Sequence, residues 1–224
     1  FAVLNRRLSG SIELYRKYSR DLFADYTINP IFGANASSSY TLSRNAAKVN
    51  GKGIDLALNG VIVQKGDFRY DAKLTYSYNT NEVISSPYEM SPYFYSSGGG
   101  SGRMLEGYNM NNFWAYRWAG LDENGDSQIY NADGNIVKST ESVTNDDLVY
   151  VGTLTPKYFG GFFNTFSYKG LSLYVGITYK LGYIFQKPTI SQQAGGRNTY
   201  YEINEDMANR WREAGDEATT NVPR

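Results

Sequence analysis

The sequence predicts an all-β protein, an antiparallel up-and-down segment of a transmembrane β-barrel with about five strands and long external loops. Three observations lead to this fold class. Long segments alternate apolar with polar residues, and the connections between those segments alternate between short and long. The 224 residues also include 21 Tyr and 23 Gly but only 6 Pro, a composition typical of strands joined by tight turns.

The alternation is clearest at 171–185, where one face is apolar and the other is polar or small. The apolar face carries Leu171, Leu173, Val175, Ile177, Tyr179, Leu181 and Tyr183, and the opposite face carries Ser172, Tyr174, Gly176, Thr178, Lys180 and Gly182. Successive side chains of a strand point to opposite faces. The segment is therefore expected to have one lipid-facing side and one wet side.

Four further strands are expected near 5–19, 45–64, 67–79 and 158–168. The first three repeat the alternation, with apolar positions at Leu8, Ile12, Leu14, Ile54, Leu56, Leu58, Phe68, Tyr70 and Leu74, whereas 158–168 is aromatic on both faces. A soluble β-sandwich also alternates, so periodicity alone leaves that alternative open. The length of the segments and the Tyr residues at the ends of their apolar faces favour a membrane barrel.

The connections support the same choice. Residues 64–67 and 169–170 form tight turns, whereas 20–44, 80–157 and 186–224 are long. Bacterial outer-membrane barrels have short turns on the periplasmic side and long loops outside, so the three long segments are expected to be extracellular. About five strands cannot close such a barrel, whose smallest form has about eight. The chain is thus expected to be part of one larger barrel domain.

Composition excludes several classes of function. The chain has no Cys and no His, which removes disulfides, thiolate zinc sites and the commonest catalytic base. Lys and Arg total 22, as do Asp and Glu, so no basic surface indicates a nucleic-acid partner. No nucleophile–base pair is recognisable. We expect no enzyme activity, no required cofactor and no binding of nucleic acid.

Several motifs, in order along the chain, resemble the SusC/RagA-type TonB-dependent outer-membrane transporters. They lie at 7–23, 45–56, 77–83, 150–161 and 210–224. The second resembles the family's Asn-x-Gly-x-x-x-Asn-x-Gly-x-Glu strand, with Ala47 and Asp55 in place of Gly and Glu. The last resembles Arg-Trp-x-x-Pro-Gly-Asp, with Ala214 in place of Pro.

The resemblance implies a bacterial outer-membrane importer whose 22-stranded barrel surrounds an N-terminal plug. It implies uptake of oligosaccharides or peptides, energy from the TonB complex acting through the plug, and a SusD-type surface lipoprotein as lid. The chain starts at Phe1 and ends without a terminal aromatic strand, so plug and terminal strands are expected outside it. A soluble carbohydrate-binding or adhesin module and a passive porin are the alternatives.

Aromatic residues cluster inside the long 80–157 segment. Trp114, Tyr116 and Trp118, with Tyr108 nearby in sequence, could present flat rings to a substrate or to the lid protein. The simpler interpretation, which we favour, is that these rings pack a small core within the segment itself.

Two further groups carry charge. Asp122, Asn124 and Asp126 supply oxygen ligands suited to Ca²⁺, but the spacing departs from the EF-hand pattern, and two tight turns around a short strand explain it more simply. Glu13, Asp55, Arg69, Asp71 and Lys73 are expected on the wet face, where they would contact the plug or, less simply, substrate. Residues 202–214 are expected to form a short helix, capped by Asn204 and packed through Trp211.

Overall fold

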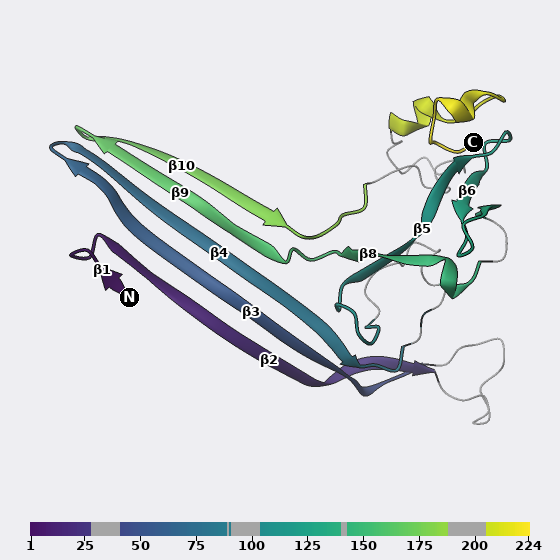
Figure 1. Ribbon diagram of the computed structural model, residues 1–224, viewed down its shortest axis with the longest axis horizontal. Helices are drawn as coiled ribbons and strands as arrows, with labels where there is room; N and C mark the ends of the chain where they lie inside the picture. Colours follow the sequence, from purple (N-terminus) through teal and green to yellow (C-terminus); the bar gives the residue numbers. More distant parts are fainter. Residues whose placement is uncertain (28–40, 89, 91–103, 140–142, 188–204) are drawn as a thin grey trace. The chain divides into compact units, whose positions relative to one another are not determined.

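The computed structural model describes residues 1–27, 41–88, 90, 104–139, 143–187 and 205–224. It is all-β, with antiparallel sheets, as predicted (Figure 1). The chain divides into two compact units. We call Phe1–Glu89, Gly102–Asn112 and Gly152–Ile184 the sheet unit, and Met90–Ser101, Phe113–Val151 and Phe185–Arg224 the loop unit. No helix in the described ranges is both long and apolar enough to cross a membrane.

The sheet unit contains a six-stranded antiparallel sheet in the order β1-β2-β3-β4-β9-β10. Its strands are β1 (Ala2–Val3), β2 (Leu8–Thr27), β3 (Thr41–Lys65), β4 (Phe68–Ser85), β9 (Tyr158–Tyr168) and β10 (Leu171–Leu181). Figure 1 shows the hairpin turns of β3–β4 and β9–β10 at the same end of the sheet. In these turns Gly66, Lys169 and Gly170 adopt positive φ angles of 57°, 46° and 85°, a conformation that glycine adopts most readily.

Three of the strands extend farther than the alternation predicts, into segments expected to be loops. β2 has 20 residues and β3 has 25. The register between them shifts between Ser19 and Leu22, where Asp21 adopts a φ of 57°. A second shift between Leu22 and Phe23 restores the register, so the bulge interrupts the alternation locally. Pairing continues to Thr27 and Thr41 without the period-2 signal that marks a strand.

The expected bounds also differ at two other ends. Leu4, Asn5 and Arg6 have φ angles of 53° to 65° and form a turn between β1 and β2, so the first long strand starts at Leu8 rather than near 5. β10 ends at Leu181 rather than 185, because Gly182 turns the backbone with a φ of 71°.

The register places the predicted apolar residues on one face across five strands. One row joins Leu14, Ile54, Tyr78 and Tyr158, and the next joins Ile12, Leu56, Tyr76, Gly160 and Tyr179. The aliphatic residues at the ends of these rows are exposed: Leu14 is 75% exposed and Ile12 62%, and Leu181, which pairs with Tyr158, is 58% exposed. The sheet therefore presents a continuous apolar band that no described residue covers.

The loop unit has a small four-stranded sheet in the order β7-β6-β5-β8. Its strands are β5 (Asn112–Leu121), β6 (Ser127–Tyr130), β7 (Ile136–Lys138) and β8 (Leu148–Thr153), and short 3₁₀ turns lie at η3 (Asn145–Asp147), η5 (Glu205–Asn209) and η6 (Asp216–Ala218). The first residue of β5, Asn112, and the last two of β8, Gly152 and Thr153, are counted with the sheet unit. The unit thus has its own secondary structure inside what the sequence presents as loop.

The predicted helix at 202–214 is wrong in the part that the structure describes. Only η5 is helical there, and residues 202–204, including the expected cap Asn204, lie outside the described residues. The chain reverses because the Asp216 carboxylate accepts the backbone amides of Arg212 (3.0 Å) and Glu213 (3.2 Å). Gly215 follows in the left-handed region with a φ of 107°, which ends any helical path.

Candidate functional site

The five predicted wet-face charges lie on the face opposite the apolar band, with Glu13 and Asp55 two rows away from Lys73. Glu13 pairs directly with Asp55 across β2 and β3. The Arg69 guanidinium donates two hydrogen bonds to the Asp71 carboxylate, at 2.6 and 2.7 Å. Near the hairpin end, a pocket of about 460 Å³ includes Asp71 and Lys73 together with Arg6, Arg7, Phe163 and Tyr174. This face is polar and charged, as an aqueous or plugged interior requires.

Tyrosine rings cross glycines on both faces of the sheet. On the wet face, the Tyr15 ring lies over Gly53 and its hydroxyl accepts a hydrogen bond from the Asn79 side chain (3.0 Å). On the apolar face, the Tyr179 hydroxyl passes Gly160 and reaches the Thr75 carbonyl (3.4 Å). A Cβ at either glycine would overlap neighbouring atoms, so these glycines are required for the rings to lie flat across three strands.

The predicted aromatic cluster of the loop unit lies mainly on the covered side of the small sheet. Trp118 pairs with Ile129, which pairs with Val137. Trp114 and Tyr116 are four and two residues before Trp118 on β5, so their side chains point to the same face. Trp114 is only 7% exposed, and its ring centroid lies 5.5 Å from that of Tyr150. Trp118 is 45% exposed. Packing thus accounts for Trp114, while Trp118 keeps a surface that a ligand could contact.

The opposite face of the small sheet is exposed. It carries Arg117, Tyr130 and Ile136 in one row, with the Arg117 guanidinium 5.7 Å from the Tyr130 ring centroid. Tyr108, the fourth predicted aromatic residue, belongs instead to the sheet unit, where its carbonyl accepts the amide of Val83 (2.9 Å).

Tyr116 is held beside a structured acid. Asp147 is 8% exposed, and its carboxylate accepts the amides of Thr144 and Ala132, each at 2.7 Å. These backbone hydrogen bonds lower the pKa of Asp147. Burial and the Asp147 charge raise the pKa of Tyr116, whose hydroxyl has no hydrogen-bond partner among the described residues.

The predicted calcium ligands form a tight turn stabilised by cations of the chain. The Asp122 side chain accepts the amides of Asn124 and Asp126, each at 2.9 Å. Lys138 lies 2.7 Å from Asp122 and 3.4 Å from Asp126, and Arg224 lies 3.0 Å from Asp126. The Lys138 ammonium and these amides lower the pKa of Asp122 to about 2.

Two turns therefore bracket a short strand, as the simpler interpretation predicted. Asn131 repeats the pattern of Asp122, accepting the amide of Asn135 through its side chain (2.8 Å), and β6 lies between the two turns. Within the ranges the structure describes, no cluster of three or more acidic residues is arranged to hold a metal ion.

The first turn anchors the C-terminal segment of the loop unit. The Trp211 ring packs against Gly125, where an added Cβ would lie 2.5 Å from the ring. The indole donates a hydrogen bond to Glu217 (3.1 Å), and the Trp211 amide donates to the Val222 carbonyl (2.9 Å). The tryptophan of the Arg-Trp motif thus has a structural role.

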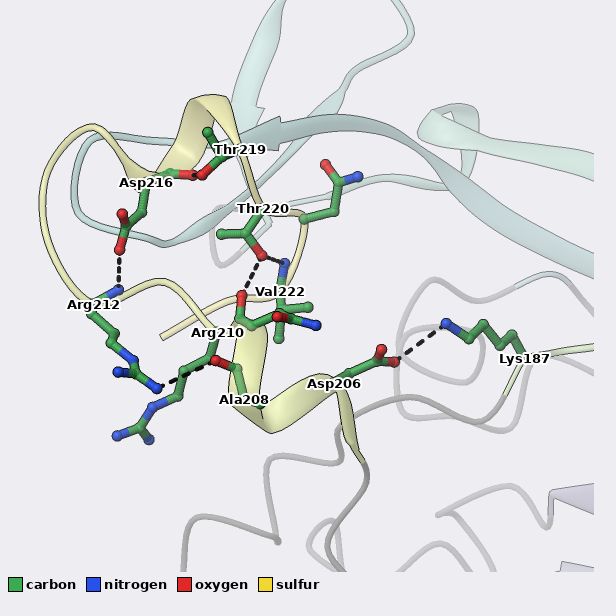
Figure 2. Close-up of a pocket in the computed structure, with 11 residues that line it drawn as sticks. Lys187, Asp206, Ala208, Arg210, Arg212, Asp216, Thr219, Thr220 and Val222 are labelled. Atoms are coloured by element: carbon green, nitrogen blue, oxygen red, sulfur yellow. Dashed lines mark hydrogen bonds and ion pairs between the residues drawn. The ribbon is translucent and has the colours of Figure 1, made fainter.

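A polar pocket of about 650 Å³ opens beside this anchor (Figure 2). The charged residues of its lining are Lys187, Asp206, Arg210, Arg212 and Asp216. The acids already have partners, since Asp206 lies 3.4 Å from Lys187 and Asp216 caps the turn. The guanidinium groups of Arg210 and Arg212 extend to the same side of the pocket in Figure 2.

Neither guanidinium pairs with a carboxylate in the described part of the chain. Arg212 donates to the Ala208 carbonyl (3.3 Å), and the described residues contain no ion pair to Arg210. Two such groups with free donors suit a carboxylate or another anion. In the sequence Arg210 stands out only as part of the Arg-Trp motif, and nothing local indicates a pocket beside Arg210 and Arg212.

Comparisons with known proteins match the predicted resemblance. No protein-family model matches the chain. The TonB-dependent receptor P26 of Formosa agariphila is 24% identical to it over 248 residues, covering all of this chain and 23% of the relative. The structure also matches the RagAB peptide importer in its closed-closed state, with a TM-score of 0.70 and 25% identity, and the RagAB peptide transporter, with 0.68 and 26%.

Both structures are matched over all of this chain but only 24% of their own, so the chain spans about a quarter of the length of its relatives. The motifs, the two-faced antiparallel sheet and these matches over the whole of this chain together identify it as a stretch of barrel related to the SusC/RagA-type TonB-dependent transporters.

Proposed function

We propose that this chain forms part of the wall and the surface loops of an outer-membrane importer energised by TonB. The observation that carries the proposal is the apolar band. On β9 the band runs between Tyr158 and Tyr168, which are 39% and 51% exposed. Their separation of 10 residues corresponds to roughly 34 Å along a strand and, at a tilt of about 40°, to about 25 Å across the membrane.

This height is that of the apolar belt of outer-membrane barrels, which aromatic residues border at both interfaces. A soluble module would instead expose this continuous band to water, which favours aggregation. The opposite face would line the interior, and its charged pocket near Lys73 would contact the plug. These features favour the barrel over the soluble adhesin alternative.

Spin labels give a direct test in the full-length protein, with any cysteine outside this chain replaced, because the chain itself contains none. Ile12 and Ser11 are neighbours at the same depth, on the apolar and the polar face respectively. In lipid vesicles, the spin relaxation caused by oxygen, which concentrates in lipid, is compared with that caused by a water-soluble nickel complex. A label at Ile12→Cys should show a high oxygen-to-nickel ratio, and a label at Ser11→Cys a lower one. Equal ratios at both positions, or a protein that stays soluble without detergent, would refute the proposal.

For the transported substrate we propose peptides or oligosaccharides, captured under a SusD-type surface lipoprotein. Similarity to the RagAB peptide importer favours peptides, and the arginine pocket of the loop unit suits a carboxylate terminus. A strain lacking the gene should grow normally on amino acids but lose growth on peptides of defined length. Loss of growth on glycans alone would instead support the oligosaccharide alternative, and co-purification with a lipoprotein would test the lid.

A further inference from the structure

Two basic side chains lie immediately beyond the apolar band, on the same face. The outermost row of the band contains Leu14, Ile54 and Tyr78, and the next row pairs Arg16 with Lys52 and Lys52 with Thr80. This row lies on the side of the band away from the hairpin turns, which share one end of the sheet in Figure 1, and β2 and β3 continue beyond it to Thr27 and Thr41. If the band faces lipid, as the proposed function holds, Arg16 and Lys52 lie at the depth of the outer-leaflet headgroups.

An anion would relieve the repulsion between these two side chains. Like charges directly opposite one another in an antiparallel pair are destabilising. Arg16 donates to the Asn50 side chain (3.4 Å) and lies 4.7 Å from the Tyr18 ring centroid, both neutral groups. Among the described residues, neither Arg16 nor Lys52 forms an ion pair, although Glu82 lies in the following row beside Asn50.

An apolar surface continues directly below the two charges. A shallow pocket of about 410 Å³ is lined by Arg16 and Lys52 together with Leu14, Ile54 and Tyr78 of the neighbouring row. Basic groups above an apolar groove match the amphipathic form of a lipid, with an anionic headgroup above an acyl chain. A soluble anion would use only the charged half of this surface.

We propose that Arg16 and Lys52 bind the phosphate of an acylated, phosphorylated glycolipid of the outer leaflet, whose acyl chain lies along Leu14, Ile54 and Tyr78. The inference rests on the proposed membrane location of the band. The site lies outside the barrel, on the face opposite the charges expected to contact the plug. It would fix the wall to its leaflet without taking part in transport.

The test uses the full-length protein in detergent, titrated with a phosphorylated lipid A, with the same lipid after enzymatic removal of its phosphates, and with inorganic phosphate. Arg16→Gln with Lys52→Gln should weaken binding about 25-fold, since each cation near an anionic lipid contributes roughly five-fold. Lys65→Gln with Lys169→Gln removes the same charge at the turn end and should leave affinity unchanged. Native mass spectrometry counts the lipid retained by each protein.

Wild-type protein that binds the dephosphorylated lipid equally well would overturn the inference, and so would equal affinity in the two double variants. Binding of inorganic phosphate at the same affinity as the lipid would show a plain anion site and overturn the assignment to a lipid. Because the lipid comparison uses the wild-type protein, it decides the question even if a variant does not fold. A protein that inserts in vesicles but shows no lipid preference overturns only this inference, whereas one that needs no detergent overturns the proposed function.

Discussion

The contact between Trp211 and Gly125 can be isolated, because the loop unit contains a matched turn that lacks it. Gly125 and Gly134 occupy equivalent positions in the two turns, with φ angles of 75° and 84°. An added Cβ meets the Trp211 ring at 2.5 Å from Gly125, whereas nothing lies within 4 Å of a Cβ at Gly134. Substitution by Ala therefore causes the same backbone strain at both positions but a steric clash only at Gly125.

The expected magnitudes follow from these two terms. A left-handed conformation costs Ala about 1–2 kcal/mol, so Gly134→Ala should destabilise the loop unit by about that amount. Overpacking adds about 1–3 kcal/mol, so Gly125→Ala should cost about 2–5 kcal/mol. Since each 1.4 kcal/mol is tenfold in an equilibrium constant, local opening at 205–224 should be at least several-fold more frequent in Gly125→Ala than in Gly134→Ala.

Hydrogen exchange with mass spectrometry on the full-length protein measures that opening directly. Peptides covering 205–224 should lose protection in Gly125→Ala and keep it in Gly134→Ala, while peptides from β2 to β4 should not change in either. In a Trp211→Ala background, Gly125→Ala should cost no more than Gly134→Ala, because the clashing ring is gone. Equal loss of protection at 205–224 in the two single glycine variants would refute the packing argument.

Three further predictions concern other parts of the chain. The folded loop unit lowers the pKa of Asp122 from an ordinary 3.8 to about 2, so this carboxylate stabilises the unit above about pH 4 and the stabilisation should fade as the pH drops towards 2. Digestion by pepsin between pH 5 and 2 measures this loss, and an unchanged acid profile in Lys138→Met would contradict the assigned cause. Gly160→Ala should destabilise the barrel by about 1–3 kcal/mol, since its Cβ would overlap the Thr75 carbonyl, whereas a Cβ at Gly51 meets nothing closer than 3.8 Å. Denaturant unfolding in micelles compares the two variants, and equal midpoints would argue against the close approach of β4 and β9. Arg210→Gln should reduce uptake of a carboxylate-bearing substrate about tenfold or more, given about 1.5–3 kcal/mol for a hydrogen bond to a charged group, and should leave uptake of the amidated substrate unchanged. An equal loss of uptake for both substrates would mean that Arg210 acts on folding alone.

The period-2 alternation within single strands explains why much of the fold could be predicted. Alternation at 171–181 and 68–78 requires no knowledge of neighbouring strands, because each side chain's face follows from its position along its own strand. Tight turns at Gly66 and Gly170 also depend on local backbone preference. The predicted wet-face charges share one face for the same reason, although their contact with a plug stays a prediction.

The candidate site was harder to predict, because its partners are distant in sequence. Asp122, Asn124 and Asp126 offered a plausible oxygen cluster, but Lys138 and Arg224 neutralise it. Trp211 was expected on a helix and instead packs on Gly125. Arg210 and Arg212 became candidates only when the folded chain placed them around a pocket.

The sequence by itself determined the all-β class, the two faces of the long strands, the hairpin turns and the relationship to TonB-dependent transporters. These properties depend on period-2 patterning, turn residues and motif order, all of which are local. Only the tertiary structure decided the pairing of β4 with β9, the bulge at Asp21, and which cation meets which carboxylate. Those depend on contacts between residues far apart in the chain, whose free energy no short stretch of sequence contains.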